Sequence, residues 1–417
     1  MNHSKKPGIV IVGLGPAGLT ALDGVRDHDA DVPVTIVSGE PHYAYFRPRL
    51  SHLLGSEILP QQIAVKPHAW YDERRAEVLL GRAARAIDTR HRAVVLDDGA
   101  SLPARAVVLA CGSSPFVPPL PGRDRDGVFS LRTVADAQAI TEACSRAGTV
   151  CVVGAGPLGL EAAWALAKLD LQVHLLEHGP RLLAKMLDEP ASQMLADIVA
   201  RAGIQLHLAA SSESVTAEGV RLSGGQDVPG EVVLFSTGVR PNLGLARSAG
   251  ISVNRGVVVD ANMRTSEPWV FAAGDVAEFA GAPGGTWPVA MSQGKVAGAN
   301  AARAGVADGL IEYSAVPPSY TLMVMGTRIF TIGDVQTQDG VGLAAIISED
   351  EARGIRRKLV LRGGKLVGGL LFGDLAKSDK IRDGVERGVE LPVAEVGAAP
   401  DYEQVMEMLV GALAAGV

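Results

Sequence analysis

The chain has 417 residues, more than a single hydrophobic core usually holds, and this length predicts two or three domains. Apolar residues make up 47% of the chain and aromatic residues 4%, with 49 glycines, a composition typical of an α/β protein with many tight turns. The net charge of −7 argues against nucleic acid as a general partner, and three cysteines without close pairing indicate neither a disulfide framework nor a metal site and fit a reducing cytoplasm.

The N-terminus imitates a signal peptide, because Lys5 and Lys6 precede the apolar stretch 9–22. Glycines at regular spacing interrupt that stretch and charged residues follow it at once, so we expect a folded strand and helix instead. No other window offers the roughly 18 uninterrupted apolar residues that a membrane span requires.

The first element is a buried strand at Ile9–Val12 that runs into a G-x-G-x-x-G turn and a helix. In such a turn the free N–H groups of the new helix bind a pyrophosphate. The cofactor-binding residues expected here are Gly13, Gly15, Pro16, Ala17 and Gly18. The next strand, Val34–Val37, is followed by Glu40, about 20 residues after the turn, where an acid can bind an adenosine ribose.

A further strand at Ala106–Ala110 ends in the glycine turn that contains Cys111 and Gly112. The proline-rich segment Pro115–Pro121 follows, and its restricted backbone fits a crossing between domains.

The same phosphate-binding pattern recurs after the strand Val150–Val153. Its expected cofactor-binding residues are Gly154, Gly156, Pro157, Leu158 and Gly159. The strand Val173–Leu176 then ends in Glu177, whose carboxylate favours a free ribose 2′-hydroxyl and repels a 2′-phosphate. The second unit is therefore expected to prefer NADH over NADPH, a preference that His178 and Arg181 moderate.

Two strands bring the chain back to the first unit. Glu231–Phe235 leads to a turn that contains Gly238 and Arg240, and a strand from Val270 ends in Gly274 and Asp275. We therefore expect a first domain over 1–117 and 242–312, interrupted by a second domain over 118–241. Arg240 fits a nucleotide contact or a domain-crossing ion pair equally well.

The sequence pattern changes in the segment 313–417. Short alternating runs joined by glycine turns predict strands at 328–332, 358–361 and 366–372. Helices are expected from about Ser378 to Arg387 and from about Tyr402. The predicted fold class is α/β, with two Rossmann-like dinucleotide domains and a small C-terminal α+β domain.

The ordered motifs resemble the FAD-dependent pyridine-nucleotide:disulfide oxidoreductase superfamily. Within it, the chain is most similar to NADH:rubredoxin reductases and to the reductase portions of bacterial NADH-dependent nitrite reductases. The residues that carry the resemblance are Gly13–Gly18, Tyr45–His52, Cys111–Gly112, Gly154–Glu161, Glu177, Gly238–Asn242 and Ala273–Asp275. The resemblance implies that the first glycine turn holds FAD and the second NADH. It also implies that Asp275 contacts the FAD ribitol and that segment 287–294, with Ala290, starts a helix at the flavin's pyrimidine end.

The resemblance further implies catalytic roles for three residues. Arg47, followed by Pro48, would lie beside flavin N5, although a surface arginine before a turn is the alternative. His52 matches a position where ferredoxin reductases carry lysine. The alternative is that His52 has only a structural role, in capping or packing. Glu161 would lie beside the nicotinamide, or on a solvated helix face.

The family carries its redox-active cysteines in the segment that corresponds to residues 47–56. This chain has no cysteine there. Without a thiolate, thiol–disulfide exchange has no attacking group, and electrons must leave the flavin by another route. Cys111 is expected to be a buried inert thiol, with an approach to the flavin as the alternative, and Cys144 and Cys151 are expected to pack. No metal site is expected.

These observations predict an enzyme that passes electrons from NADH through FAD to a small iron protein, most simply rubredoxin. The basic stretch 351–387 could steer an acidic carrier, or be an ordinary solvated surface. Alternatives are the electron-entry subunit of a nitrite reductase-type complex and an NADH-sensing flavoprotein resembling apoptosis-inducing factor. The sequence leaves a homodimer open.

Overall fold

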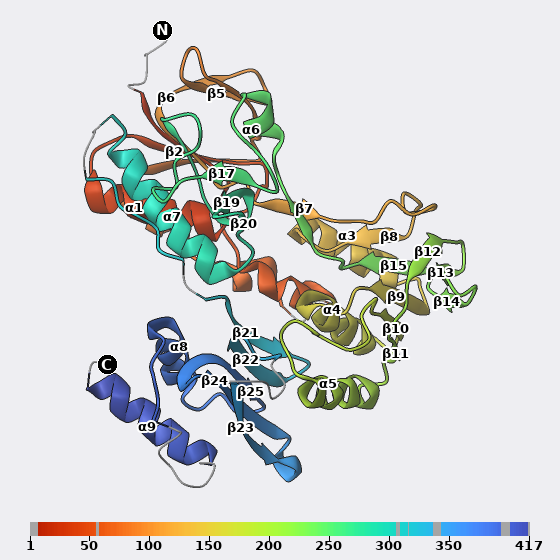
Figure 1. Ribbon diagram of the computed structural model, residues 1–417. Coiled ribbons are helices and arrows are strands. Elements are labelled where there is room, and N and C mark those ends of the chain that lie inside the picture. Colours follow the sequence, from red (N-terminus) through yellow and green to blue (C-terminus); the bar gives the residue numbers. More distant parts are fainter. Residues whose placement is uncertain are drawn as a thin grey trace. The chain divides into compact units, whose positions relative to one another are not determined.

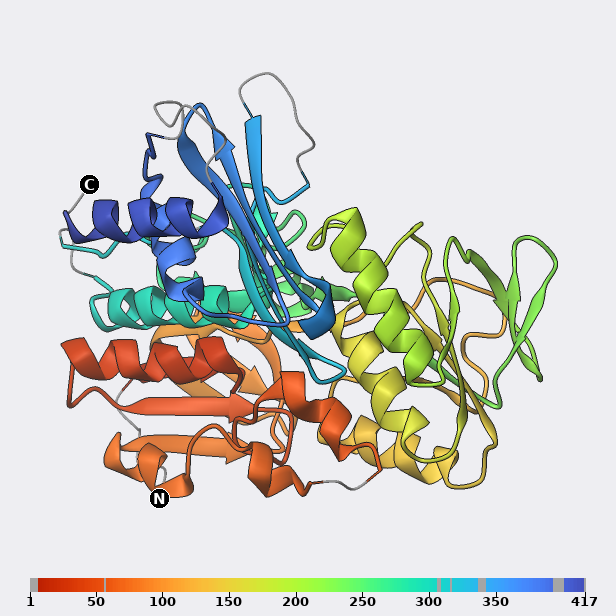
Figure 2. The ribbon, with the colours of Figure 1, turned by 90° about the horizontal axis from the view of Figure 1, so that it is seen from below.

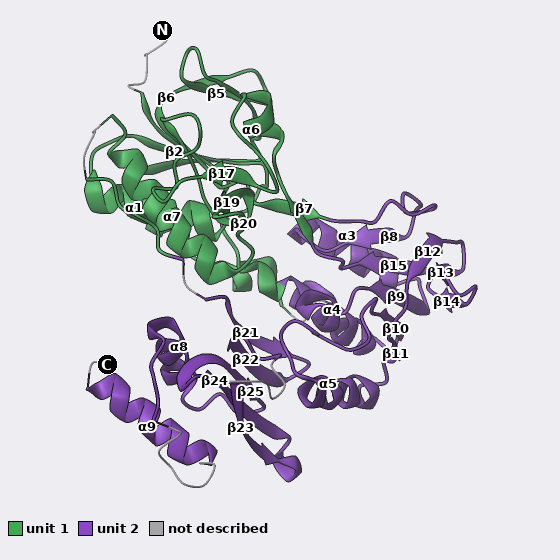
Figure 3. Ribbon diagram, viewed as in Figure 1, with its two compact units in different colours: residues 1–49, 58–115, 239–314 green, residues 50–57, 116–238, 315–417 purple. Residues whose placement is uncertain are grey.

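The computed structural model describes residues 7–55, 58–305, 309–315, 317–336, 343–392 and 401–415. The chain divides into two compact units, which Figure 3 colours green and purple. The first contains 1–49, 58–115 and 239–314, and the second contains 50–57, 116–238 and 315–417. Lys5 and Lys6 lie outside the described residues. No helix in the described part of the chain has both the length and the apolar character needed to cross a membrane.

A parallel sheet forms the centre of the first unit (Figure 1). Its strands, in spatial order, are β3 (Ala76–Leu80), β2 (Val34–Ser38), β1 (Gly8–Val12), β6 (Ser101–Leu109) and β18 (Val270–Ala272). All of β1 is buried, as expected of a parallel strand covered on both faces. Because β18 pairs with β6, the chain after residue 242 returns to this sheet.

Two helices, α1 (Pro16–His28) and α7 (Trp287–Ala302), lie side by side against this sheet (Figures 1 and 2). Their approach depends on glycine, because an added Cβ at Gly294 or Gly298 would strike backbone oxygens of α1. The close packing fixes the start of α7 near the first glycine turn.

The remaining elements of the first unit surround this core. They are β4 (Ala84–Asp88), β5 (Ala93–Leu96), β7 (Ser113–Pro115), β16 (Val239–Pro241), β17 (Val257–Val259), β19 (Ala277–Phe279), β20 (Ala282–Pro283), α2 (His68–Glu73), α6 (Gly244–Ser248), and the 3-10 turns η1 (Arg47–Leu53), η2 (Pro60–Ile63) and η3 (Gly274–Val276). The strands β7 and β16 pair antiparallel, so the outgoing and returning connections run together as one ribbon.

The second unit contains another parallel sheet, with its own helices. Its strand order is β11 (Gln205–His207), β10 (Gln172–Leu176), β9 (Thr149–Val153), β15 (Val232–Phe235) and β8 (Val128–Ser130). The helices are α3 (Val134–Cys144), α4 (Pro157–Ala167) and α5 (Glu189–Arg201), and a small antiparallel sheet is formed by β12 (Ser212–Val215), β13 (Gly219–Leu222) and β14 (Asp227–Pro229).

The same unit includes the C-terminal region, an antiparallel sheet with two helices. The strand order is β21 (Ser319–Val324), β22 (Thr327–Gly333), β25 (Lys365–Phe372), β24 (Ile355–Arg362) and β23 (Leu343–Asp350). Helices α8 (Ser378–Arg387) and α9 (Tyr402–Ala414) pack on it, so both predicted helices are confirmed.

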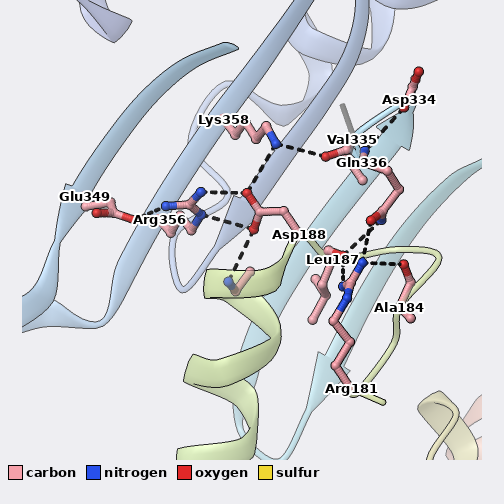
Figure 4. A network of polar contacts seen from close by, with 11 residues as sticks. Arg181, Ala184, Leu187, Asp188, Asp334, Val335, Gln336, Glu349, Arg356 and Lys358 are labelled. Atoms are coloured by element: carbon pink, nitrogen blue, oxygen red, sulfur yellow. Dashed lines mark hydrogen bonds and ion pairs between the residues drawn. The ribbon is translucent and has the colours of Figure 1, made fainter. Parts of the chain in front are cut away.

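A buried ionic cluster joins β24 to the start of α5 (Figure 4). Arg356 donates to both carboxylate oxygens of Asp188, at 3.2 and 2.6 Å, and the Lys358 ammonium lies 3.3 Å from the same carboxylate. Asp188 also caps α5 by accepting from the N–H of Ala191. This cluster ties the C-terminal sheet to the second parallel-sheet domain.

The basic stretch 351–387 therefore does not form one continuous positive face. Two of its cations, Arg356 and Lys358, are buried, and others pair with acids of the C-terminal region. These pairs are Arg357 with Asp374, Arg362 with Asp334, Lys377 with Glu403 and Lys380 with Asp379.

Candidate functional site

The first glycine turn leaves an open space where a phosphate would bind. An added Cβ at Gly13 or Gly18 would strike neighbouring backbone, whereas at Gly15 it would meet no atom within 4 Å. Helix α1 begins there with Pro16 at its first position and without a side-chain cap. The N–H groups of this turn can therefore serve an anionic ligand.

Residues from three distant segments converge behind this turn. The turn at Gly274 packs against Ala17 of α1 and Ala290 of α7, since an added Cβ at Gly274 would lie 3.0 and 3.3 Å from their Cβ atoms. Buried Gln293 accepts the N–H of Gly274 at 2.9 Å and holds the turn in place. Three predicted residues are thus brought together, and Gln293, which the sequence did not single out, supports them.

Asp275, the residue expected at the ribitol, is oriented by a serine. The Ser113 hydroxyl donates to its Oδ2 at 2.7 Å, and Ser113 itself is buried. One carboxylate oxygen is thereby fixed, which restricts the direction in which the other can reach a ligand.

The turn at Cys111 and Gly112 is fastened to the returning connection. Asn242 donates from its side chain to the carbonyl of Cys111 at 2.8 Å, and from its main chain to the carbonyl of Gly112 at 3.0 Å. Shielding from water raises the pKa of the Cys111 thiol to about 11, and burial does the same for Cys144, to about 11, and for Cys151, to about 12. All three thiols are therefore protonated at neutral pH and poor nucleophiles.

Arg47 lies in a tight group with Glu40 and Tyr45. Its guanidinium contacts a Glu40 carboxylate oxygen at 2.5 Å and donates to the Tyr45 hydroxyl at 2.8 Å. That hydroxyl donates to the other Glu40 oxygen at 2.5 Å. Glu40 was expected at the adenosine ribose and Arg47 at flavin N5, which are opposite ends of an extended FAD. Because the two side chains are in direct contact, at most one of these two expectations can be right.

The second glycine turn repeats the arrangement of the first. An added Cβ at Gly156 would meet no atom within 4 Å, whereas at Gly154 or Gly159 it would strike backbone. Helix α4 begins at Pro157 without a side-chain cap, while α3 and α5 are capped by Thr133 and Asp188. The first turn of α4 is thus open to a phosphate in the same way.

Glu177 lies at the end of β10 and reaches back to this turn. Its carboxylate accepts the N–H of Ala155 at 3.1 Å and that of Gly179 at 2.7 Å. Ala155 belongs to the glycine turn itself, so the carboxylate stands beside the expected pyrophosphate position, as a ribose-binding acid would.

Glu161 and His52 come together in the second unit. Glu161 is buried on α4, with 9% of its side chain exposed, so the solvated-face alternative is wrong. Its Oε2 lies 4.0 Å from His52 Nε2, and its Oε1 accepts the main-chain N–H of Met325 at 2.8 Å. At 4.0 Å the histidine contact is an ion pair only when His52 is protonated.

The remaining predicted residues lie on several elements of the two units. Leu158 is exposed at 38% on the first turn of α4, and Pro48 is exposed in η1. Gly238 has a positive φ of 95° at the start of the returning connection, and Ala110 directly follows β6, beside Gly13. Arg240 is exposed.

The residues present fit two dinucleotides. Each glycine turn combines open space over its second glycine, an uncapped helix start and an acid after the next strand. The supporting residues that sequence reasoning missed are Tyr45, Ser113, Asn242, Gln293 and Met325. Tyr45, Ser113, Asn242 and Gln293 lie inside motifs or turns already recognised, whereas Met325 carries no local signal.

A family model described as pyridine nucleotide-disulphide oxidoreductase matches residues 7–294, which include both glycine turns. The chain belongs to this family. Both glycine turns thus lie in a region shared with pyridine-nucleotide oxidoreductases. A second model, described as the rubredoxin NAD+ reductase C-terminal domain, matches residues 318–389.

Several known proteins are similar over most of the chain. The assimilatory nitrate reductase electron transfer subunit of Bacillus subtilis is 31% identical over 94% of this chain and 51% of its own length. The biphenyl dioxygenase system ferredoxin–NAD(+) reductase component of Paraburkholderia xenovorans is 33% identical over 79% of this chain and 81% of its own. The crystal structure of NADH:rubredoxin oxidoreductase from Clostridium acetobutylicum superposes with a TM-score of 0.77 at 26% identity, covering 96% of this chain and 99% of that one. The chain thus spans about half the length of some relatives and nearly all of others.

Proposed function

We propose that this flavoprotein takes electrons from NADH and delivers them to a small iron protein of the rubredoxin class. The C-terminal match over 318–389 supports rubredoxin in particular, and so does the similarity to a rubredoxin reductase over nearly its whole length. FAD, when bound, supplies the chemistry of accepting an electron pair from NADH and releasing electrons one at a time.

The observation that carries this proposal is the combination of two open glycine turns with three protonated thiols. Two dinucleotide sites provide a donor and a relay. The raised thiol pKa values leave no cysteine prepared for disulfide exchange. The electrons must therefore go to an external acceptor.

The chain's own residues bind and orient the two cofactors. The amides at the starts of α1 and α4 bind phosphates. Asp275, held by Ser113, orients the ribitol, and Glu177 selects a nucleotide with a free 2′-hydroxyl. The start of α7 stabilises negative charge at the flavin's pyrimidine end, by about 0.3–1 kcal/mol.

Glu161 and His52 are the residues that we assign to the nicotinamide side. A buried carboxylate with a histidine beside it can orient the nicotinamide and balance charge during electron transfer. We move Arg47 from flavin N5 to the adenosine end, where it and Tyr45 hold the Glu40 carboxylate.

Stopped-flow reduction of the bound flavin by NADH tests the assignment. Substituting Glu161→Gln or His52→Ala should slow flavin reduction by about 10-fold or more. The matched control Glu142→Gln alters an exposed glutamate on α3 and should leave the rate unchanged. Wild-type kinetics in both site variants would remove Glu161 and His52 from the mechanism.

An acceptor screen tests the rest of the proposal. Reduced enzyme is mixed with rubredoxin, ferredoxin, a quinone or oxygen, and rubredoxin should reoxidise it fastest. Slow reduction by NADH, a long-lived charge-transfer band and no fast acceptor would instead favour an NADH-sensing flavoprotein.

A second candidate is the electron-entry part of a larger nitrate or nitrite reductase system. It is favoured because the chain matches about half of two such Bacillus subtilis proteins, 51% and 48% of their lengths. Copurification with a separate reductase subunit, together with slow turnover on rubredoxin, would support it. Light scattering on the same preparation measures whether the chain forms a homodimer.

A further inference from the structure

One hairpin of the C-terminal sheet contacts the carboxylate assigned to the nicotinamide site. The strands β21 and β22 are joined by Met325 and Gly326, because Val324 pairs directly with Thr327. The main-chain N–H of Met325 donates to Glu161 Oε1 at 2.8 Å, and the contact is buried. The hairpin and α4 lie beside each other in Figure 1 and belong to the same compact unit.

The turn is strained at Met325. Both turn residues have positive φ, 48° at Met325 and 77° at Gly326, as a two-residue type I′ hairpin turn requires. Asparagine or glycine usually occupies the first position, because a longer side chain disfavours positive φ. Strain of this kind persists where the surroundings enforce it, and it often marks a functional site.

The surroundings of the turn provide that enforcement. Gly326 lies against Trp164, whose ring would be 3.7 Å from an added Cβ. Trp164 is three residues after Glu161 on α4, so both side chains lie on the same face of the helix. The Lys168 ammonium lies 3.8 Å from the centre of the Trp164 ring and covers it. The turn is thus seated on the helix face that carries Glu161.

The hydrogen bond serves both partners. The N–H of Met325 lies inside a tight turn, outside the ladder between the two strands, and would be a buried unsatisfied donor without Glu161. The carboxylate has one oxygen fixed by this donor, while its other oxygen is the one that lies 4.0 Å from His52. Fixing Oε1 therefore sets the direction of Oε2.

We propose that the Met325–Gly326 turn is a positioning element for Glu161, and that the C-terminal domain thereby takes part in reduction of the flavin by NADH. This inference rests on the role of Glu161 in the proposed function. It goes beyond that function, because it gives the C-terminal domain a task on the NADH side of the reaction in addition to any role in receiving the acceptor.

The test displaces the turn without touching Glu161. Valine at position 326 cannot adopt a φ of 77° without strain, so Gly326→Val should shift the N–H of Met325. We expect the limiting rate of flavin reduction at saturating NADH to fall on the order of 10-fold, as for loss of one hydrogen bond to a charged group. The milder Gly326→Ala should give a smaller fall in the same direction and provides a second, less disruptive variant.

A control variant separates positioning from general damage. Gly363→Val disturbs the other two-residue turn of the same sheet, where an added Cβ would meet no atom within 4 Å, and it should leave the reduction rate unchanged. A comparable loss of rate in Gly363→Val would overturn the proposal, because any damage to the sheet would then suffice.

A double-mutant cycle decides whether the turn acts through Glu161. In a Glu161→Ala background, Gly326→Val should slow reduction no further, because the group that it positions is gone. An undiminished effect of Gly326→Val in that background would refute the positioning role while leaving Glu161 in place. If Glu161→Ala alone left the rate unchanged, the assignment of Glu161 in the proposed function would fail, and this inference with it.

Discussion

Replacing Asp188 by asparagine would isolate the charge at the centre of the ionic cluster that joins β24 to α5. Asp188 contacts Arg356 and Lys358 (Figure 4). As whole residues, the three are 7%, 4% and 5% exposed. Burial alone would raise the pKa of Asp188, but the hydrogen bond and charge of Arg356, with the charge of Lys358, outweigh it and lower the pKa. The folded protein therefore holds two buried cations on one ionised acid.

The expected loss follows from what the substitution leaves behind. Asparagine can still cap α5 by accepting from the N–H of Ala191, so the helix start is kept. Buried Arg356 keeps Glu349, whose side chain is 45% exposed, as a counter-charge, and buried Lys358 still donates to the carbonyl of Val335. Both cations nevertheless lose the charge of Asp188, and breaking a buried pair in this way costs about 3–5 kcal/mol. For a domain of 150–250 residues, this corresponds to a fall of roughly 6–20 °C in the unfolding midpoint.

Thermal and urea unfolding, followed by far-ultraviolet circular dichroism, provide the assay. The matched control is Asp401→Asn, because Asp401 caps α9 in the same way from an exposed position. That variant should lose less than about 1 kcal/mol. Equal losses in the two variants would refute the charge argument and leave only a capping effect.

The pH dependence gives an independent check of the same reasoning. Because the folded pKa of Asp188 is lowered, its stabilisation is present above the unfolded pKa of about 3.9 and is lost as the pH falls through the folded value. Wild type should therefore lose this contribution only in acid, whereas Asp188→Asn should lack it at neutral pH. A difference between the two proteins that stayed constant down to pH 2 would contradict this account.

Three further predictions concern cofactor binding and thiol chemistry. Substituting Glu177→Ala should reduce the ratio of kcat/KM for NADH over NADPH at least several-fold, and an unchanged ratio would show that Glu177 does not read the ribose. Ser113→Ala should weaken FAD binding by about 1 kcal/mol, roughly fivefold in Kd, as fluorescence titration of the apoprotein would measure, and an unchanged Kd would show that Ser113 does not orient Asp275 for FAD. Exchange of all three cysteines for alanine should preserve turnover with the acceptor, because their thiols have a raised pKa. Loss of turnover with intact nucleotide binding would instead indicate that a cysteine carries electrons.

The sequence by itself determined the two nucleotide-binding turns and the strands that lead into them. Buried runs such as Ile9–Val12 and Val150–Val153 are recognisable because parallel strands covered on both faces are continuously apolar. The glycine spacing then indicates the turn that follows, since it reports a local requirement for space and backbone conformation. The helix at Ser378–Arg387 was equally predictable, whereas short strands such as β12 and β14, with few apolar residues, were not.

Only the tertiary structure decided how charged side chains are paired. The count of basic residues in 351–387 fitted either a positive face or an ordinary solvated surface, whereas Arg356 and Lys358 point into the protein, toward an aspartate more than 150 positions earlier. Arg47 was assigned to the flavin from the family resemblance, whereas in the fold its guanidinium contacts Glu40, the acid expected at the adenosine ribose. Met325 carries no local signal, because its role rests on a main-chain N–H that folding brings to Glu161. Sequence motifs reflect local requirements of the backbone, whereas contacts between residues distant in sequence form only when the chain folds and packs.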